Sequence, residues 1–161
     1  MTGKADYTDE EWAKLRRAPF VAGMAISIAD PGGPIELAKE TMASMKTVSA
    51  PGSDEPLLVA VSQDAMAMVQ QRQNPMADLK PKGSMAGQQV LDELRGINEI
   101  LTAKATPEEA AAFRQWLMTA AQEAANAAKE GGFMGFGAVR VSEGEQAMLE
   151  QIKKALGTDA A

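Results

Sequence analysis

The sequence predicts an all-α protein that folds as a single globular helical bundle of about seven helices over residues 1–161. Polar residues that begin helices recur along the chain, and the apolar residues between them follow a three- and four-residue spacing. Aromatic residues make up only 4% of the chain, which holds eleven Met. A core of Ala, Leu, Ile, Val and Met suits closely packed helices, because Ala lets backbones approach and Met fills irregular gaps.

The N-terminal part begins with a capping-box pattern, Thr8-Asp9-Glu10-Glu11, which predicts a helix over about residues 9–17. Pro19 lacks an N–H and would break a helix interior, so we expect a separate buried helix over about 19–29. The apolar run there, FVAGMAISIA, is also compatible with a buried strand. Because no similar run lies nearby to pair with it, the helix is the better interpretation. Pro34 then begins a helix that extends to about residue 48.

The rest of the chain repeats these signals. Apolar stripes predict helices over about 54–73, 86–103 and 107–129, the last preceded by the capping-box pattern Thr106-Pro107-Glu108-Glu109. A third pattern starts at Ser142, and Gly157 stands where a glycine would end that helix. We expect loops at 49–56 and 74–87, and mobile ends at 1–8 and 158–161.

Composition excludes several classes of function. The net charge of −6 with scattered Lys and Arg disfavours a nucleic-acid partner. The absence of Cys and His removes disulfides, thiolate chemistry and Cys/His zinc sites, so any metal would be a hard cation held by oxygen, such as Ca²⁺ or Mg²⁺. The longest apolar run is too short to span a bilayer, and no signal region is present, which predicts a soluble cytoplasmic protein without a transmembrane segment.

The glycine-rich segment 131–137, GGFMGFG, raises the question of a binding loop. It lacks the Lys-Ser/Thr of a phosphate loop and leads to an acidic helix start, so a phosphate site is rejected. Its large apolar residues, Phe133, Met134 and Phe136, would be unfavourable in water. Either they fold back over the core, or they form a contact surface for a protein partner, a second copy of the chain or an apolar ligand. In the 74–87 loop, Met76 and Met85 leave the same two alternatives open.

One pattern occurs twice in the chain. Residues 20–40 and 120–145 each place a small-residue helix before an acidic residue, a glycine pair and an acidic helix start. This layout resembles the TerB-like tellurite-resistance family, most clearly in AANAAKEGG…VSEGEQAMLEQIKKALG. The resemblance implies an all-helical fold of two pseudo-repeated halves and a stress-response or accessory role. The Asp-Gly turn typical of the family is Glu130-Gly131 in one half and Asp30-Pro31-Gly32 in the other.

The resemblance also implies carboxylates that hold a divalent cation, Ca²⁺ or Mg²⁺. The candidates are Asp30 with Glu36 or Glu40, and Glu130 with Glu143 or Glu145. The same residues have a structural interpretation, because acidic side chains in the first turn favour the helix dipole and Glu145 completes a capping box. No residue pattern marks a catalytic group, and Trp12 and Trp116 have the spacing of core residues. We therefore expect a non-enzymatic TerB-like protein, or alternatively a helical interaction protein that docks through segment 131–137.

Overall fold

The computed structural model describes residues 1–31, 34–129 and 141–158 of the chain. In these ranges the regular structure is helical. Of Pro34, Glu36, Ala128 and Lys129 only the backbone is described. Within these ranges there is no strand, and the elements in chain order are the α-helices α1 (Asp9–Ala29), α2 (Pro34–Ser49), α3 (Pro56–Gln70), α4 (Ala86–Lys104), α5 (Pro107–Lys129) and α6 (Glu143–Ala155), with short 3-10 turns η1 (Lys4–Asp6) and η2 (Gly83–Met85). The predicted all-α class is therefore confirmed.

The capping boxes predicted from the sequence form as expected. The Thr8 hydroxyl accepts a hydrogen bond from the Glu11 amide at 3.1 Å, and the Glu11 carboxylate accepts from the Thr8 amide at 2.8 Å. Thr106 with Glu109, and Ser142 with Glu145, form the same reciprocal pair. These bonds satisfy amides at helix starts that have no partner inside the helix.

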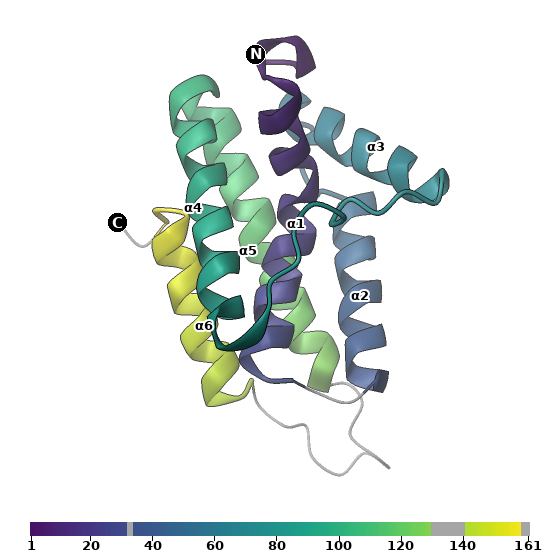
Figure 1. Cartoon of the computed structure of the whole chain (residues 1–161). Helices are drawn as coiled ribbons and strands as arrows, with labels where there is room; N and C mark the ends of the chain where they lie inside the picture. The colour runs from purple at the N-terminus through teal and green to yellow at the C-terminus, as the bar shows by residue number, and fades with distance from the viewer. Residues whose placement is uncertain (32–33, 130–140, 159–161) are drawn as a thin grey trace.

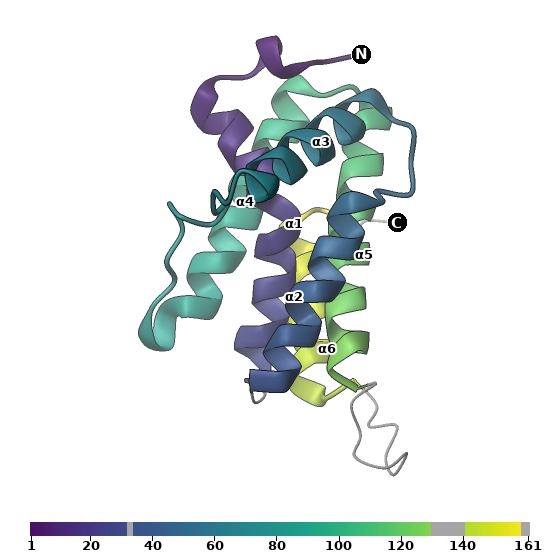
Figure 2. The same ribbon diagram turned by 90° about the vertical axis from the view of Figure 1, so that its right-hand side faces the viewer.

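The predicted break at Pro19 is wrong, because α1 continues through it as one helix of 21 residues. Proline costs about 3 kcal/mol in a helix interior, since it removes one backbone hydrogen bond and crowds the preceding turn. Here Pro19 is buried between the buried residues Ala18 and Val21, so apolar packing on both sides offsets that cost. In Figure 2 the N-terminal part of α1 is tilted relative to its C-terminal part, as expected of a helix bent at proline. The described residues hold six α-helices because of this continuity.

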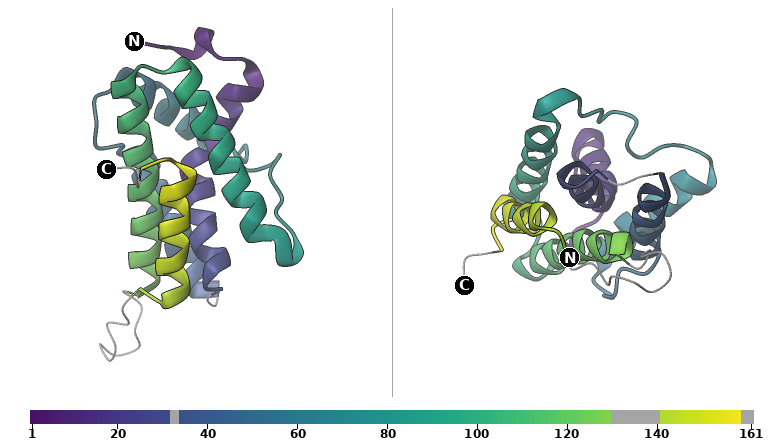
Figure 3. Two further views of the ribbon diagram at one scale, coloured as in Figure 1. Left: turned by 90° about the vertical axis from the view of Figure 1, so that its left-hand side faces the viewer. Right: turned by 90° about the horizontal axis from the view of Figure 1, so that it is seen from below.

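Helix α1 is the centre of the bundle and contacts every other α-helix of the described chain. Figure 1 shows α2 on one side of α1, α4 and α6 on the other, and α5 behind it, while α3 crosses near the top. The view from below in Figure 3 shows the same arrangement, with α1 surrounded by its neighbours. None of the helices in the described ranges combines the length and hydropathy that crossing a membrane requires.

The core is one cluster of apolar side chains contributed by all six helices. Alanines on α1 and α5 are fully buried, and they let these helices approach closely. Trp12 and Trp116 are both buried, which confirms the prediction that they are packing residues. Trp116 packs edge-on against Phe113, with ring centroids 5.3 Å apart.

The N-terminal segment packs against the bundle, although residues 1–8 were expected to be mobile. Tyr7 is buried, and its hydroxyl lies 2.9 Å from the Thr2 hydroxyl. The Thr2 amide and hydroxyl donate hydrogen bonds to the buried Glu109 carboxylate at 2.5 and 2.9 Å. Glu109 therefore caps α5 and also ties down the start of the chain, a contact between residues 107 positions apart.

Three carboxylates at this end of the bundle have lowered pKa values. Burial alone would raise the pKa of Glu109, but hydrogen bonds from the amides of Thr106 and Thr2 outweigh it and lower the pKa. Burial likewise opposes the lowered pKa of Asp64, which results from hydrogen bonds donated by Trp12 and Arg16. The pKa of Glu11 is lowered mainly by its hydrogen bond from Lys104.

We predict that the free energy of unfolding falls as the pH drops from 6 to 3. A carboxylate whose pKa is lower in the folded state stabilises the fold above its unfolded pKa, and the contribution is lost as the pH falls through the folded pKa. Urea unfolding across this range measures the effect. Glu109→Gln should lower the free energy of unfolding by about 2 kcal/mol at pH 7, because the NH₂ group of the new side chain would face one of the backbone amides that donate to Glu109. The variant should also show a weaker dependence of this free energy on pH. An unchanged pH dependence in Glu109→Gln would contradict the role of this carboxylate.

Candidate functional site

Helices α1 and α2 form an antiparallel hairpin whose facing residues line a largely apolar pocket. Two contacts fix the register of the pair. The Ser27 hydroxyl on α1 donates a hydrogen bond to the Glu40 carboxylate on α2. One turn earlier on α1, a Cβ atom at Gly23 would lie 2.4 Å from the Ser44 hydroxyl oxygen. Only a glycine fits there without displacing Ser44, so the two helices approach closely at this level.

The C-terminal end of α2 is held by hydrogen bonds from α5 and α3. The Trp116 indole on α5 donates to the Thr47 carbonyl at 3.0 Å, and the Ser62 hydroxyl on α3 donates to the Val48 carbonyl at 2.5 Å. These buried bonds satisfy carbonyls in the last turn of α2, which lack partners within the helix. They also hold α2 in place against α3 and α5, beside the groove between α1 and α2.

A pocket of about 360 Å³ lies in this groove. Its volume is within the range of about 300–1,000 Å³ that is usual for small-molecule sites. The apolar part of the wall comes from three helices and the loop after α3, and comprises Phe20, Met24, Leu37, Met45, Val69, Pro75 and Met76. Methionines suit such a wall, because their flexible thioether side chains adapt to ligands of different shape.

The polar part of the wall centres on Glu40, whose side chain is nearly buried at 3% exposure. A carboxylate at this depth requires polar partners, and the Ser27 hydroxyl is one of them. Ser44, Thr41, Gln73 and Asn74 complete the polar wall. Among the described residues that line the pocket, Glu40 alone carries a formal charge.

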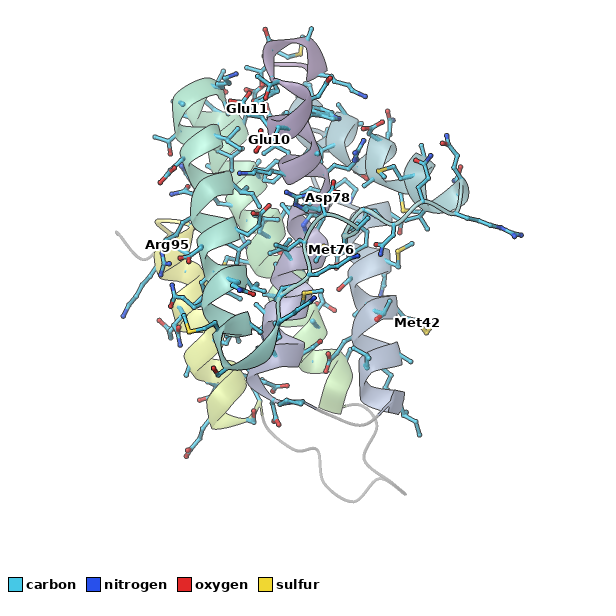
Figure 4. The ribbon with its side chains drawn as sticks, in the orientation of Figure 1. Glu10, Glu11, Met42, Met76, Asp78 and Arg95 are labelled. Atoms are coloured by element: carbon cyan, nitrogen blue, oxygen red, sulfur yellow. The ribbon has the colours of Figure 1, made fainter. Side chains whose placement is uncertain are left out.

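The loop after α3 closes one side of the pocket through residues 73–76. Figure 1 shows this segment crossing in front of α1 before it descends to the start of α4. The Asn74 side chain accepts a hydrogen bond from the Met76 amide at 2.9 Å, which shapes the turn that points Met76 inward. In Figure 4 Met76 lies on this crossing segment between α1 and α2, with Asp78 just beyond it.

Arg17 on α1 anchors the same loop. Its guanidinium is largely buried and donates to the Glu93 carboxylate of α4 at 2.8 Å. It also lies 4.0 Å from the Asp78 carboxylate, next to the pocket-lining part of the loop. This ion pair connects α1, α4 and the loop.

The carboxylates predicted as cation ligands lie at different positions in the structure. Asp30 caps the C-terminal end of α1 and is exposed, and Glu143 and Glu145 lie in the first turn of α6. These two helix ends touch, because a Cβ at Gly144 would lie 3.0 Å from the Ala29 carbonyl oxygen. Glu145 is buried, and its carboxylate accepts from the Ser142 amide in the capping box at 3.0 Å.

Other predicted site residues fall outside what is described. These are Glu130 and the apolar residues Phe133, Met134 and Phe136, together with the side chain of Glu36. In the remaining ranges no group of three or more acidic side chains lies close enough to hold a metal ion. The two methionines of the 74–87 loop differ in placement, since Met76 packs in the pocket wall and Met85 is exposed.

The pocket itself was missed by the sequence interpretation. Phe20, Gly23, Met24 and Ser27 recur at helical spacing, which is the pattern of an ordinary core stripe. One available signal was the polar stripe on the facing helix, where Glu40, Thr41 and Ser44 follow the same spacing. Nothing in the sequence indicated that these two stripes face each other.

Comparison with known protein families, characterised proteins and solved structures finds no match to this chain. The resemblance to the TerB-like family therefore stays a prediction from the sequence.

Proposed function

We propose that this protein is a non-enzymatic binding protein for a small, mainly apolar molecule, which it holds in the pocket between α1 and α2. The observation that carries the proposal is the pocket itself, a space of about 360 Å³ with a largely apolar wall and a small set of polar groups on one side. This combination is typical of small-molecule sites, where apolar contact supplies affinity and a few polar groups set orientation.

The methionines provide a direct test, because three of them line the pocket and others lie outside it. Met24, Met45 and Met76 are in the wall, whereas Met42 on the outer side of α2 is 72% exposed (Figure 4). Protein labelled with ¹³C at the methionine methyl groups would be titrated with the neutral probe 4-phenylbutanol and followed by NMR. We expect saturable shifts at the three wall methionines and none at Met42.

Two variants of α2 test whether the probe binds in this pocket. Thr41→Phe places a large ring at the rim of the pocket, and Met42→Phe places the same ring one residue later on the exposed side. Thr41→Phe should weaken probe binding about tenfold, the equivalent of 1.4 kcal/mol, while Met42→Phe should leave it unchanged. Equal effects of the two variants, or shifts that do not saturate at millimolar probe, would refute a specific site.

A second candidate is the TerB-like role, with a stress response in the cytoplasm and a divalent cation between two pseudo-repeated halves. What favours it is the contact between the end of α1 and the start of α6, which brings Asp30 close to the acidic first turn of α6. Ca²⁺ or Mg²⁺ should then raise the melting temperature, and Glu143→Gln should abolish the rise.

Glu10→Gln is the matched control for this test, because Glu10 also lies in an acidic first turn, at the opposite end of α1. Its carboxylate is exposed and faces Lys14, 3.9 Å away. The variant should keep the full response to cation. A melting temperature that does not change at millimolar Ca²⁺ and Mg²⁺ would exclude this candidate.

A further inference from the structure

Resting on the proposed function, we infer that the loop after α3 is a lid, whose opening and closing controls how fast ligands enter and leave the α1–α2 pocket. The lid comprises residues 73–82, which lie between Arg72 and Gly83. Its latch is the ion pair of Asp78 with Arg17 on α1. The inference concerns the exchange of ligand, and it applies to any molecule that the pocket holds.

The mouth of the pocket is formed partly by a helix and partly by this loop. The lining residues Gly23 on α1 and Ser44 on α2 are buried and form its floor. Thr41 on α2 and residues 73–74 of the loop also line the pocket but are exposed, so they lie at its mouth. Helix α2 is held by buried hydrogen bonds from α5 and α3, whereas the loop lies outside the helices. A displacement of the loop would therefore widen the mouth while both helices stay in place.

Few interactions attach the lid to the helices beneath it. Within the described chain, residues 74–81 make their hydrogen bonds with each other. The amides of Met76 and Ala77 donate to Asn74, and the Leu79 amide donates to the Met76 carbonyl. Met76 and Leu79 pack against the core but stay partly exposed. The lid can therefore lift from α1 as a unit, without the loss of a hydrogen bond to a helix.

The latch opens at little cost. The Asp78 side chain is 85% exposed and lies 4.0 Å from the Arg17 guanidinium, and exposed ion pairs of this kind contribute little to stability. Arg17 also has a second partner, since it donates to Glu93 at 2.8 Å. When Asp78 moves away, the largely buried guanidinium therefore keeps its pairing with Glu93, and no uncompensated charge is left between the helices.

The backbone provides a hinge at the start of the lid. Arg72 has a φ of 58° and is the only residue other than glycine with a positive φ in the described ranges. This conformation is uncommon and strained for a residue with a side chain. A rotation of the backbone at Arg72 would relieve the strain, and residues next to the end of a helix commonly absorb the change in φ and ψ when a lid opens.

Asp78→Asn tests the latch on the full-length protein, because it removes the ion pair without a change of size. The rates of association and dissociation of 4-phenylbutanol would be measured from NMR line shapes of the wall methionines. We expect both rates to rise about threefold while the Kd stays the same, since entry and exit both pass through the open lid. Lys80→Gln is the matched control, because Lys80 is exposed on the same loop and has no ion pair in the described chain. It should leave both rates unchanged.

A second measurement needs no probe. Relaxation dispersion of the methionine methyl groups reports motion on the μs–ms timescale, in which lids open. In the unliganded protein we expect dispersion at Met76 on the lid and none at Met118, which is also partly buried against the core but lies on α5. Asp78→Asn should increase the dispersion at Met76.

The outcomes separate this inference from the proposed function. If the probe binds but Asp78→Asn changes neither rate, the pocket is a ligand site and the lid is wrong. A rise in the dissociation rate alone would also overturn the lid, because it would mean a lost contact with the ligand. Equal dispersion at Met76 and Met118 would have the same consequence. If the probe does not bind, the proposed function fails and the lid has no ligand to control.

Discussion

Trp116→Ala is expected to lower the free energy of unfolding by about 4 kcal/mol, as large-to-small changes at buried aromatic residues do. Trp116 is among the largest fully buried side chains, and its removal leaves a cavity beside Phe113. It also leaves the buried Thr47 carbonyl without its indole donor. Urea unfolding followed by far-UV circular dichroism at pH 7 measures the change.

Trp116→Phe separates the two contributions of this residue. The ring keeps most of the apolar contact but cannot donate to the Thr47 carbonyl, so the loss should be about 2 kcal/mol. Met42→Ala on the exposed side of α2 is the control and should stay within about 0.5 kcal/mol of the unmodified protein. A loss below about 1 kcal/mol for Trp116→Ala would mean that the core collapses around the site and that Trp116 does not hold α2 in place.

Arg17→Met is the second change with a large expected effect. The guanidinium is paired with Glu93 at 2.8 Å, and their side chains are only 9% and 12% exposed. Removing one partner leaves an uncompensated charge between α1 and α4, which costs about 3 kcal/mol. The same substitution releases the contact with Asp78, so the pocket-lining loop loses its anchor.

Two further variants test the cause of that loss. Arg95→Met removes an ion pair on α4 whose side chains are 49% and 61% exposed, and Arg95 points away from the bundle in Figure 4. Exposed pairs contribute little, so the change should be below about 0.5 kcal/mol. The double variant Arg17→Met with Glu93→Leu should recover most of the stability, because apolar replacement of a buried pair is often neutral. A double variant as unstable as Arg17→Met alone would assign the loss to packing.

The pocket and the predicted cation site differ in whether local sequence or tertiary packing brings their residues together. Asp30, Glu143 and Glu145 were recognisable in sequence because acidic residues stand beside glycines at helix ends. Glu145 also has a local partner, since its carboxylate caps α6 through Ser142. Glu40 was predicted from the sequence only as an alternative cation ligand beside Asp30, whereas its contact with Ser27 and its burial result from the packing of α2 against α1.

The sequence by itself determined the helical class, the bounds of most helices and their caps. These features depend on residues within one or two turns of each other, such as Thr8 with Glu11 or Ser142 with Glu145. The Gly157 position at the end of α6 was predictable for the same reason, and its φ is 66°.

Only the tertiary structure decided where the helices meet. The course of α1 through Pro19 depends on burial by neighbouring helices, which overrides the local cost of proline. The bond from Trp116 to Thr47 joins residues 69 positions apart, and that from Arg17 to Glu93 joins residues 76 positions apart. The pocket lies between α1 and α2, whose register is set by the contacts Ser27–Glu40 and Gly23–Ser44, and short-range sequence patterns do not encode which residues of two helices face each other.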